Sequence, residues 1–186
     1  SAYLDEMIEQ ARKLFDEGIK AERIQCDEIV ALGTPKRIVL FARGLAVKQE
    51  NVEEKIVGPP VKIAVASDGS FTKAAEGFAK SQGVSSNALA RVETPKGTYL
   101  AAIKRIKGKS TASIMRERLP QWIQAIRTPK TMRWTSGGMR FARPVRWILC
   151  LFGTEVVRVK IGGLAAGRRT RLSPLFEKTI EVKSAD

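Results

Sequence analysis

Apolar side chains recur at three- and four-residue spacing near the start of the chain. Acidic side chains crowd the same segment, which is the pattern of an amphipathic helix with one buried stripe. Gly18 would supply the left-handed residue that ends this helix. The positions that form the stripe are Leu4, Met7, Ile8, Ala11, Leu14 and Phe15.

Three pairs of β-rich runs follow, each separated by turn residues. Such pairs predict antiparallel hairpins, and the later run GLAAGRRTR predicts a further strand. The pairs are EIVALG and KRIVLFARGL around Thr34-Pro35, LARVE and TYLAAIKRI around Thr94-Pro95-Lys96-Gly97, and VRWILCLFG and EVVRVKIGG around Gly153-Thr154.

Two more helices are expected between these hairpins. Thr72 is placed to cap a helix through KAAEGFAKSQ, and Ser110 to cap one that runs to about residue 126 and must bend or restart at Pro120. Gly58-Pro59-Pro60 predicts connecting structure. Strands and helices mix without strict alternation, so the predicted class is α+β, with a mixed or antiparallel sheet and packed helices.

The length of 186 residues predicts a single domain, residues 1–186, with a sizeable core. No apolar run is long enough to span a bilayer, and the acidic start does not resemble a signal peptide, so we expect a cytoplasmic protein without a membrane partner. Cys26 and Cys150 lie far apart in a chain with no histidine, which predicts two buried thiols and no metal site.

Positive charge is concentrated in one part of the chain. The formal net charge is +14, and residues 127–171 contain eleven Lys and Arg against the single acid Glu155, whereas the first sixty residues contain more acids than bases. This imbalance predicts a basic segment at 127–171 that faces a polyanion.

Arginine and aromatic side chains alternate within this basic segment, which suits nucleic acid. The guanidinium fork matches phosphate, and aromatic rings can stack on unpaired bases. Trp134 fits either a base or the core, while Trp147 lies in the apolar run WILCLF that is typical of a core strand. The candidate tRNA-binding residues are Lys130, Arg133, Trp134, Arg140, Arg143, Arg168, Arg169 and Arg171.

Two alternatives limit this interpretation. Arg140, Arg143 and Arg146 fall at odd spacing around Pro144, so some of them are expected to serve the fold, and the cluster at residues 168–171 also fits a solvated loop. The chain lacks a P-loop, a histidine and a spaced ligand set, so we expect no catalytic residue and no cofactor within it.

Five motifs together resemble the β subunit of bacterial glycyl-tRNA synthetase. The likeness covers the chain from about Ile29 onward. Its most specific part is the joint presence of KTMRW and RFARPVRW. In order, the motifs are LGTPKRIVL, GPPVK, TKAAEGFAKSQGV, KTMRW followed by MRFARPVRWIL, and GRRTR.

The resemblance implies a fragment, the N-terminal quarter of a β subunit, that assembles with a smaller α subunit into a heterotetramer. In that family the α subunit holds the class II site where glycine and ATP, with magnesium, form glycyl-adenylate. The β subunit binds glycine tRNA, and its N-terminal region resembles the B3/B4 domain of the phenylalanyl-tRNA synthetase β subunit. Expected partners are therefore glycine tRNA, the α subunit and the remainder of the β subunit.

The sequence departs from the family pattern at two places. Family chains usually begin with a strand that carries an EIGTEE-like motif, and they usually have a Gly-His-Arg-Phe run after the GRRTR region. Here Leu172 follows Arg171 directly, so this loop is either deleted or absent from the sequence as given.

Three functions stay open at this point. The first is a tRNA-binding and assembly region of a ligase subunit, the second an editing-type aminoacyl-tRNA hydrolase suggested by the B3/B4 likeness, and the third a scaffold that docks an acidic protein without touching RNA.

Overall fold

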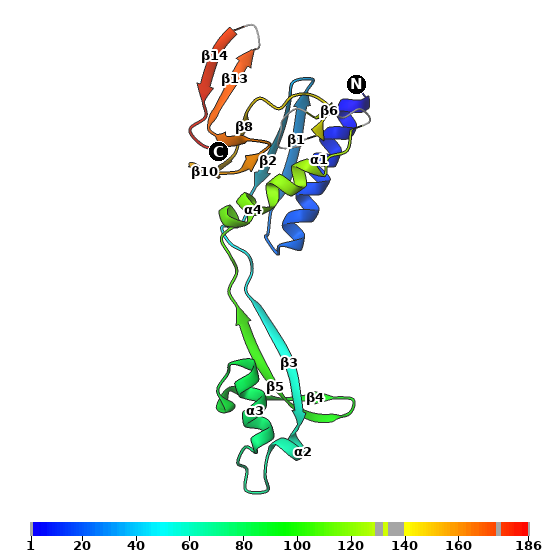
Figure 1. Ribbon diagram of the computed structural model, residues 1–186, viewed down its shortest axis with the longest axis vertical. Coiled ribbons are helices and arrows are strands. Elements are labelled where there is room, and N and C mark those ends of the chain that lie inside the picture. The colour runs from blue at the N-terminus through cyan, green and yellow to red at the C-terminus, as the bar shows by residue number, and fades with distance from the viewer. Residues whose placement is uncertain (1, 129–131, 134–139, 174–175, 186) are drawn as a thin grey trace. The chain divides into compact units, whose positions relative to one another are not determined.

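The computed structural model describes residues 2–128, 132–133, 140–173 and 176–185 (Figure 1). Within the span expected to be one domain, the packing gathers the chain into two compact units. The first unit comprises residues 1–49 and 109–186, and the second comprises residues 50–108. Each unit has its own core.

The first unit combines two helices with mostly short and mostly antiparallel strands. Its elements are α1 (Ala2–Ala21), β1 (Glu28–Thr34), β2 (Arg37–Arg43), α4 (Thr111–Gln124), β6 (Met132–Arg133), β7 (Arg140–Phe141), β8 (Ile148–Leu149), β9 (Leu151–Phe152), β10 (Glu155–Val156), β11 (Lys160–Ile161), β12 (Leu164–Gly167), β13 (Arg169–Ser173) and β14 (Phe176–Glu181).

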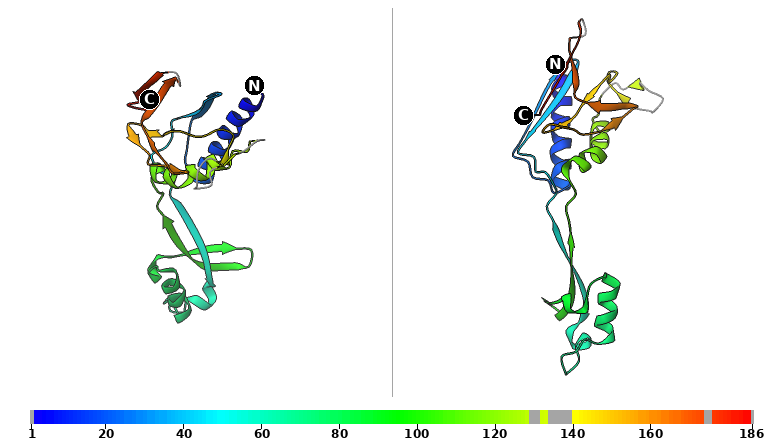
Figure 2. Two further views of the ribbon diagram at one scale, coloured as in Figure 1. Left: turned by 45° about the horizontal axis from the view of Figure 1, so that its top comes forward. Right: turned by 90° about the vertical axis from the view of Figure 1, so that its left-hand side faces the viewer.

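The hairpin β1–β2 forms as predicted, with Thr34 opposite Arg37 across a turn at Pro35-Lys36. Proline suits this turn because its ring fixes the backbone angle that a turn needs. Helix α1 runs along one face of the hairpin (Figure 2). The buried side chains of the main core are Phe15, Ile19, Ile24, Ile114, Met115, Val157, Val159 and Ile161.

The prediction that Gly18 ends the first helix is wrong. Helix α1 continues to Ala21, and the left-handed residue is Arg23, with a φ of 54°. Ile24 N donates to Ile19 O (2.9 Å) and Arg23 N to Lys20 O (3.0 Å), which is the bonding pattern of a Schellman cap.

Gly18 instead provides space where α1 meets α4. A Cβ at this position would lie closer than 3.0 Å to three ring atoms of Trp122. The Trp122 ring also packs edge-on against Phe15, with the two centroids 5.7 Å apart. Gly18 therefore allows the two helices to approach closely. Its cost is the larger loss of backbone entropy that glycine, compared with alanine, undergoes when a helix forms.

Helix α4 begins as predicted, because Ser113 N donates to Ser110 Oγ (3.3 Å). The helix does not restart at Pro120 but continues as a single element to Gln124. The nitrogen of proline cannot donate a hydrogen bond, so Arg116 O loses its usual partner within the helix.

The strands of residues 148–181 are short and pair locally. β9 and β10 form the hairpin predicted at Gly153-Thr154, and β13 pairs with β14. The run VRWILCLFG, however, is not one strand: Cys150 separates β8 from β9, and β8 pairs in parallel with β12. The predicted strand GLAAGRRTR likewise divides into β12 and β13.

The second unit is a three-stranded antiparallel sheet with helices on one face (Figure 1). Strand β5 lies in the centre, between β3 and β4, and Ala64, Ala75 and Leu100 form the core. Its elements are β3 (Val52–Pro60), α2 (Val61–Ala64), α3 (Lys73–Gln82), the 3-10 helix η1 (Ser86–Ala88), β4 (Leu89–Thr94) and β5 (Gly97–Ile106).

Predictions for this unit hold in part. Gly83 ends α3 in the left-handed conformation, but the Thr72 hydroxyl donates to Ile63 O (2.9 Å) and does not cap the helix. Gly58-Pro59-Pro60 belongs to β3, where the register shifts between Val57 and Pro60. A bulge tolerates proline because it needs fewer ladder bonds.

The fold as a whole confirms the α+β class, with mostly antiparallel strands. None of the helices in the described part of the chain has the length and apolar character needed to cross a bilayer.

A polar network that includes the buried Gln49 joins the end of α1, helix α4 and the adjacent segments at residues 49 and 109. Gln49, only 7% exposed, donates through Nε2 to Glu22 Oε2 (3.0 Å) and accepts from Lys109 N through Oε1 (3.0 Å). Glu22 Oε1 also accepts from Arg118 Nε (2.6 Å). These four residues form the Gln49 network, which satisfies polar groups that would be costly to bury alone.

Candidate nucleic-acid interface

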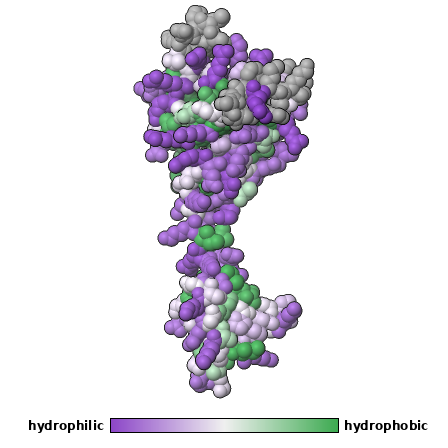
Figure 3. All heavy atoms as spheres, in the orientation of Figure 1, coloured by the Kyte–Doolittle hydropathy of each residue, from purple (hydrophilic) through white to green (hydrophobic). Residues whose placement is uncertain are grey.

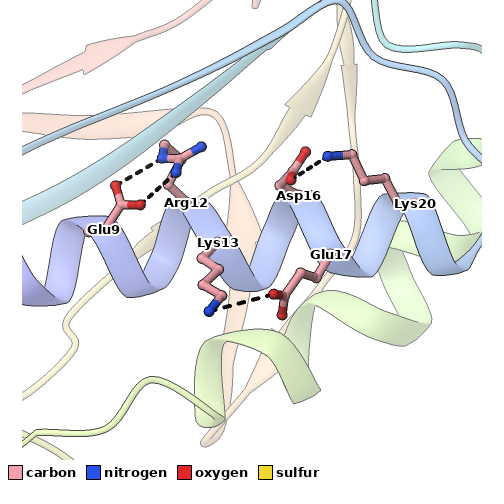
Figure 4. Close-up of polar contacts among 6 residues, drawn as sticks. All are labelled: Glu9, Arg12, Lys13, Asp16, Glu17 and Lys20. Atoms are coloured by element: carbon pink, nitrogen blue, oxygen red, sulfur yellow. Dashed lines mark hydrogen bonds and ion pairs between the residues drawn. The ribbon is translucent and has the colours of Figure 1, made fainter.

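The cations of α1 are neutralised within the helix itself (Figure 4). Arg12 binds Glu9 in a bidentate pair, Lys20 Nζ lies 2.7 Å from Asp16 Oδ2, and Lys13 Nζ lies 3.8 Å from Glu17 Oε1. The bonds from the Arg12 guanidinium hold the pKa of the Glu9 carboxyl below its usual value. Such exposed i,i+3 and i,i+4 pairs add little stability, but they leave little charge for a partner.

Several exposed arginines of the basic segment form no such ion pair within the part of the chain that the structure describes. Arg133, Arg143, Arg146 and Arg171 are exposed, and none of them forms an ion pair with a carboxylate that the structure describes. Their charge is therefore available to an external anion. In the view of Figure 3, the described surface of the first unit is mostly hydrophilic.

Two arginine positions lie directly opposite each other on the short hairpin β6–β7. The register pairs Arg133 with Arg140. Of Arg140 only the backbone is described, and Lys130 and Trp134 lie outside the described residues.

The second predicted cluster divides between the fold and solvent. Arg168 is half-buried and donates to Thr154 O (3.0 Å) and Lys183 O (3.4 Å), so its guanidinium joins neighbouring segments. Arg169 lies 3.9 Å from Glu181 across β13–β14, and both are exposed. Arg171 is exposed. The RNA-binding prediction for these residues stays a prediction. Of the three, Arg171 is exposed and has no described ion pair.

Arg37 was not among the residues predicted from the sequence, but the structure places it beside the basic segment. Its guanidinium lies 6.0 Å from the centroid of the half-buried Trp147 ring and donates to the backbone carbonyl of Arg171. A cation over the ring strengthens the packing of Trp147 within the fold. Arg37 is therefore a positioning residue that joins the start of β2 to strand β13.

The two cysteines are free but half-buried, not fully buried as predicted. Burial raises the pKa of the Cys150 thiol to about 11 and also raises the pKa of Cys26. Cys26 Sγ lies 3.3 Å from Arg43 O and 3.4 Å from Glu28 O. Neither thiol is prepared to act as a thiolate at neutral pH.

Comparison with known proteins identifies the family. The family described as glycyl-tRNA synthetase beta subunit matches residues 1–186 of the chain. The chain belongs to this family. A glycine–tRNA ligase beta subunit of Moorella thermoacetica is 40% identical over 168 residues, which is 90% of this chain and 24% of the relative.

Other relatives of the glycyl-tRNA synthetase β subunit family agree. A glycine–tRNA ligase beta subunit of Citrifermentans bemidjiense is 43% identical over 86% of this chain and 23% of its own length. One of Clostridioides difficile is 38% identical over 98% of this chain and 26% of its own length. The chain thus spans about a quarter of the length of the relatives it matches, and the resemblance read from its motifs is confirmed.

Proposed function

We propose that this chain is the tRNA-binding and assembly region of a glycine–tRNA ligase β subunit. The observation that carries the proposal is the set of exposed arginines in the basic segment without ion-pair partners among the described carboxylates. Membership of the glycyl-tRNA synthetase β subunit family points to tRNA as the polyanion, because the relatives are named for a tRNA ligase. Arginine-to-phosphate contacts position RNA without reading its sequence.

The complete enzyme would attach glycine to its tRNA. In this proposal ATP and magnesium act at a separate α subunit in the cytoplasm, and this chain contributes RNA affinity and contacts to the α subunit and to the rest of the β subunit. The paired charges on α1 would suit protein packing better than RNA binding, since they are already neutralised.

Two other functions remain hypotheses. An editing hydrolase, linked to the likeness with the B3/B4 domain, predicts that the chain releases the amino acid from a mischarged glycine tRNA. A docking scaffold predicts that the arginines are needed to assemble with the α subunit while the chain itself ignores tRNA. A deacylation assay and a pull-down with the α subunit separate these functions from RNA binding.

Replacing both Arg133 and Arg143 with alanine should weaken tRNA binding and reduce its salt dependence. Each lost phosphate contact should lower the slope of log K against log salt by about one unit, because fewer counterions are released. The measurement is a titration of the chain with glycine tRNA and with an unrelated tRNA at several salt concentrations.

Arg12→Ala is the matched control, since Arg12 is also exposed but already paired with Glu9. This variant should keep the slope of the parent chain. An unchanged slope in a folded Arg133→Ala, Arg143→Ala variant would contradict direct contact. No binding at low salt by the parent chain would favour the scaffold instead.

A further inference from the structure

The second unit has a sheet face that its helices do not cover. Leu100 on β5 points into the core with Ala64 and Ala75, so its neighbours Tyr99 and Ala101 belong to the opposite face. The register places Val92 opposite Tyr99 and Val57 opposite Ala101 on this face, where Val57 is exposed, Val92 and Tyr99 are half-buried and Ala101 is buried.

A shallow hollow of about 400 Å³ lies on this open face. Its lining residues define what we call the Tyr99 hollow: Val57, Thr94, Pro95, Lys96 and Tyr99. This volume lies within the range of about 300 to 1,000 Å³ that is typical of small-ligand sites. The hollow combines an aromatic ring from the central strand, an apolar floor and one cation at the turn.

Polar groups in the turn have local roles that leave the lysine side chain free. Thr94 Oγ1 donates to Gly97 O (2.9 Å) and accepts from Lys96 N (3.3 Å), which fixes the turn. The Lys96 side chain is exposed, and no described carboxylate pairs with it. Its ammonium group can therefore meet an anion beside the Tyr99 ring.

The remaining charges on this face also favour an anionic occupant. Lys55 lies on the same face as Val57, two positions away on β3, and is exposed. Glu53, the next acid on this face, is paired with Arg105 (2.8 Å) opposite it. Lys55 and Lys96 thus lie on or beside this face, and Glu53, the acid described on the same face, is already paired.

We propose that the Tyr99 hollow binds an unpaired nucleotide of RNA. The base stacks on the Tyr99 ring, Val57 and Pro95 provide apolar contact, and Lys96 meets the phosphate. Unpaired bases bind proteins in this way because every base presents a flat apolar surface next to an anionic backbone. The proposal adds a separate contact to the RNA-binding function proposed above, and relies on it only for the choice of RNA.

A protein partner fits this face less well. Val57 is 51% exposed, but Val92, Tyr99 and Ile103 are half-buried, so the open apolar area is small. Stable protein interfaces need a larger, well-packed apolar centre. A single RNA base with its phosphate needs no larger contact area than the hollow provides.

Fluorescence anisotropy with the 186-residue chain tests the proposal. The probes are a labelled single-stranded RNA of about eight nucleotides, within the usual site size of such surfaces, and a duplex of the same sequence. Tyr99→Ala should weaken binding of the single strand about tenfold and leave the duplex unchanged, whereas Tyr99→Phe should bind like the parent chain. Lys96→Ala should also weaken binding of the single strand, whereas Lys80→Ala, which removes an exposed charge on the helical side of this unit, should not.

Each outcome bears on one proposal at a time. If a folded Tyr99→Ala variant bound the single strand as tightly as the parent chain, the site would be overturned. It would also be overturned if replacing Tyr99 weakened binding of an acidic peptide but not of RNA. If Arg133→Ala and Arg143→Ala weaken both probes while Tyr99→Ala weakens neither, the basic segment binds RNA and the hollow does not. The reverse result would keep the Tyr99 hollow and remove the basic segment.

Discussion

Replacing Gly18 with valine should lower the free energy of unfolding of the first unit by about 3 kcal/mol. A Cβ there would overlap three atoms of the Trp122 indole, which cannot move away easily because it packs against Phe15. The added methyl groups would force α1 and α4 apart and open the main core. Thermal and urea denaturation, followed by tryptophan fluorescence, measure the change.

Gly77→Ala provides the matched control for this prediction. Gly77 lies inside α3, and a Cβ there would meet nothing within 4 Å. Its replacement should stabilise the second unit by about 0.5 to 1 kcal/mol, because alanine restricts the unfolded chain. If Gly18→Val proved as harmless as Gly77→Ala, the close contact with Trp122 would be refuted.

Removing the Gln49 side chain should cost about 2 kcal/mol of stability. Gln49→Ala leaves Lys109 N without its acceptor and removes one of the donors that Glu22 uses. Because Gln49 is almost fully buried, water cannot replace these bonds without opening the structure. Hydrogen exchange at Lys109 N, together with the midpoint of urea unfolding, measures the loss.

The control for this network is Gln124→Ala, an exposed glutamine at the end of α4. It should change the stability by less than about 0.5 kcal/mol. A double-mutant cycle between Gln49 and Glu22 should show coupling, since the two side chains share a bond of 3.0 Å. Additive effects would show that the network contributes no shared stabilisation.

Local features of the fold could be predicted from the sequence, whereas contacts between distant segments could not. The hairpin turns at Pro35 and Pro95 depend on neighbouring residues, and both formed where predicted. Gly18 was assigned a local role as a helix end, but its role is to accommodate Trp122, more than one hundred residues away. The Thr72 hydroxyl likewise bonds Ile63 O across a loop and does not cap its own helix.

The same limit applies to the candidate interface. Composition indicated that residues 127–171 carry excess charge, and several of the described arginines are exposed as an RNA surface requires. It could not separate Arg168, which bonds two backbone carbonyls, from Arg171, whose side chain is exposed. Nor could it reveal Arg37, because the contact with Trp147 joins a residue of β2 to one just before β8, more than one hundred residues later.

The path of the chain into and out of the first unit suggests how this protein could have gained a module. Gln49 N donates to Lys109 O (2.9 Å), and Lys48 pairs with Ser110 in an antiparallel bridge. The points where the chain leaves and re-enters the first unit are therefore adjacent. Insertions are best tolerated where their ends lie this close, since the host fold closes around them as around a hairpin. Residues 50–108 can therefore be viewed as a unit inserted between β2 and α4 of the first unit. Such a unit could change in sequence or be replaced without changes to the core of the first unit.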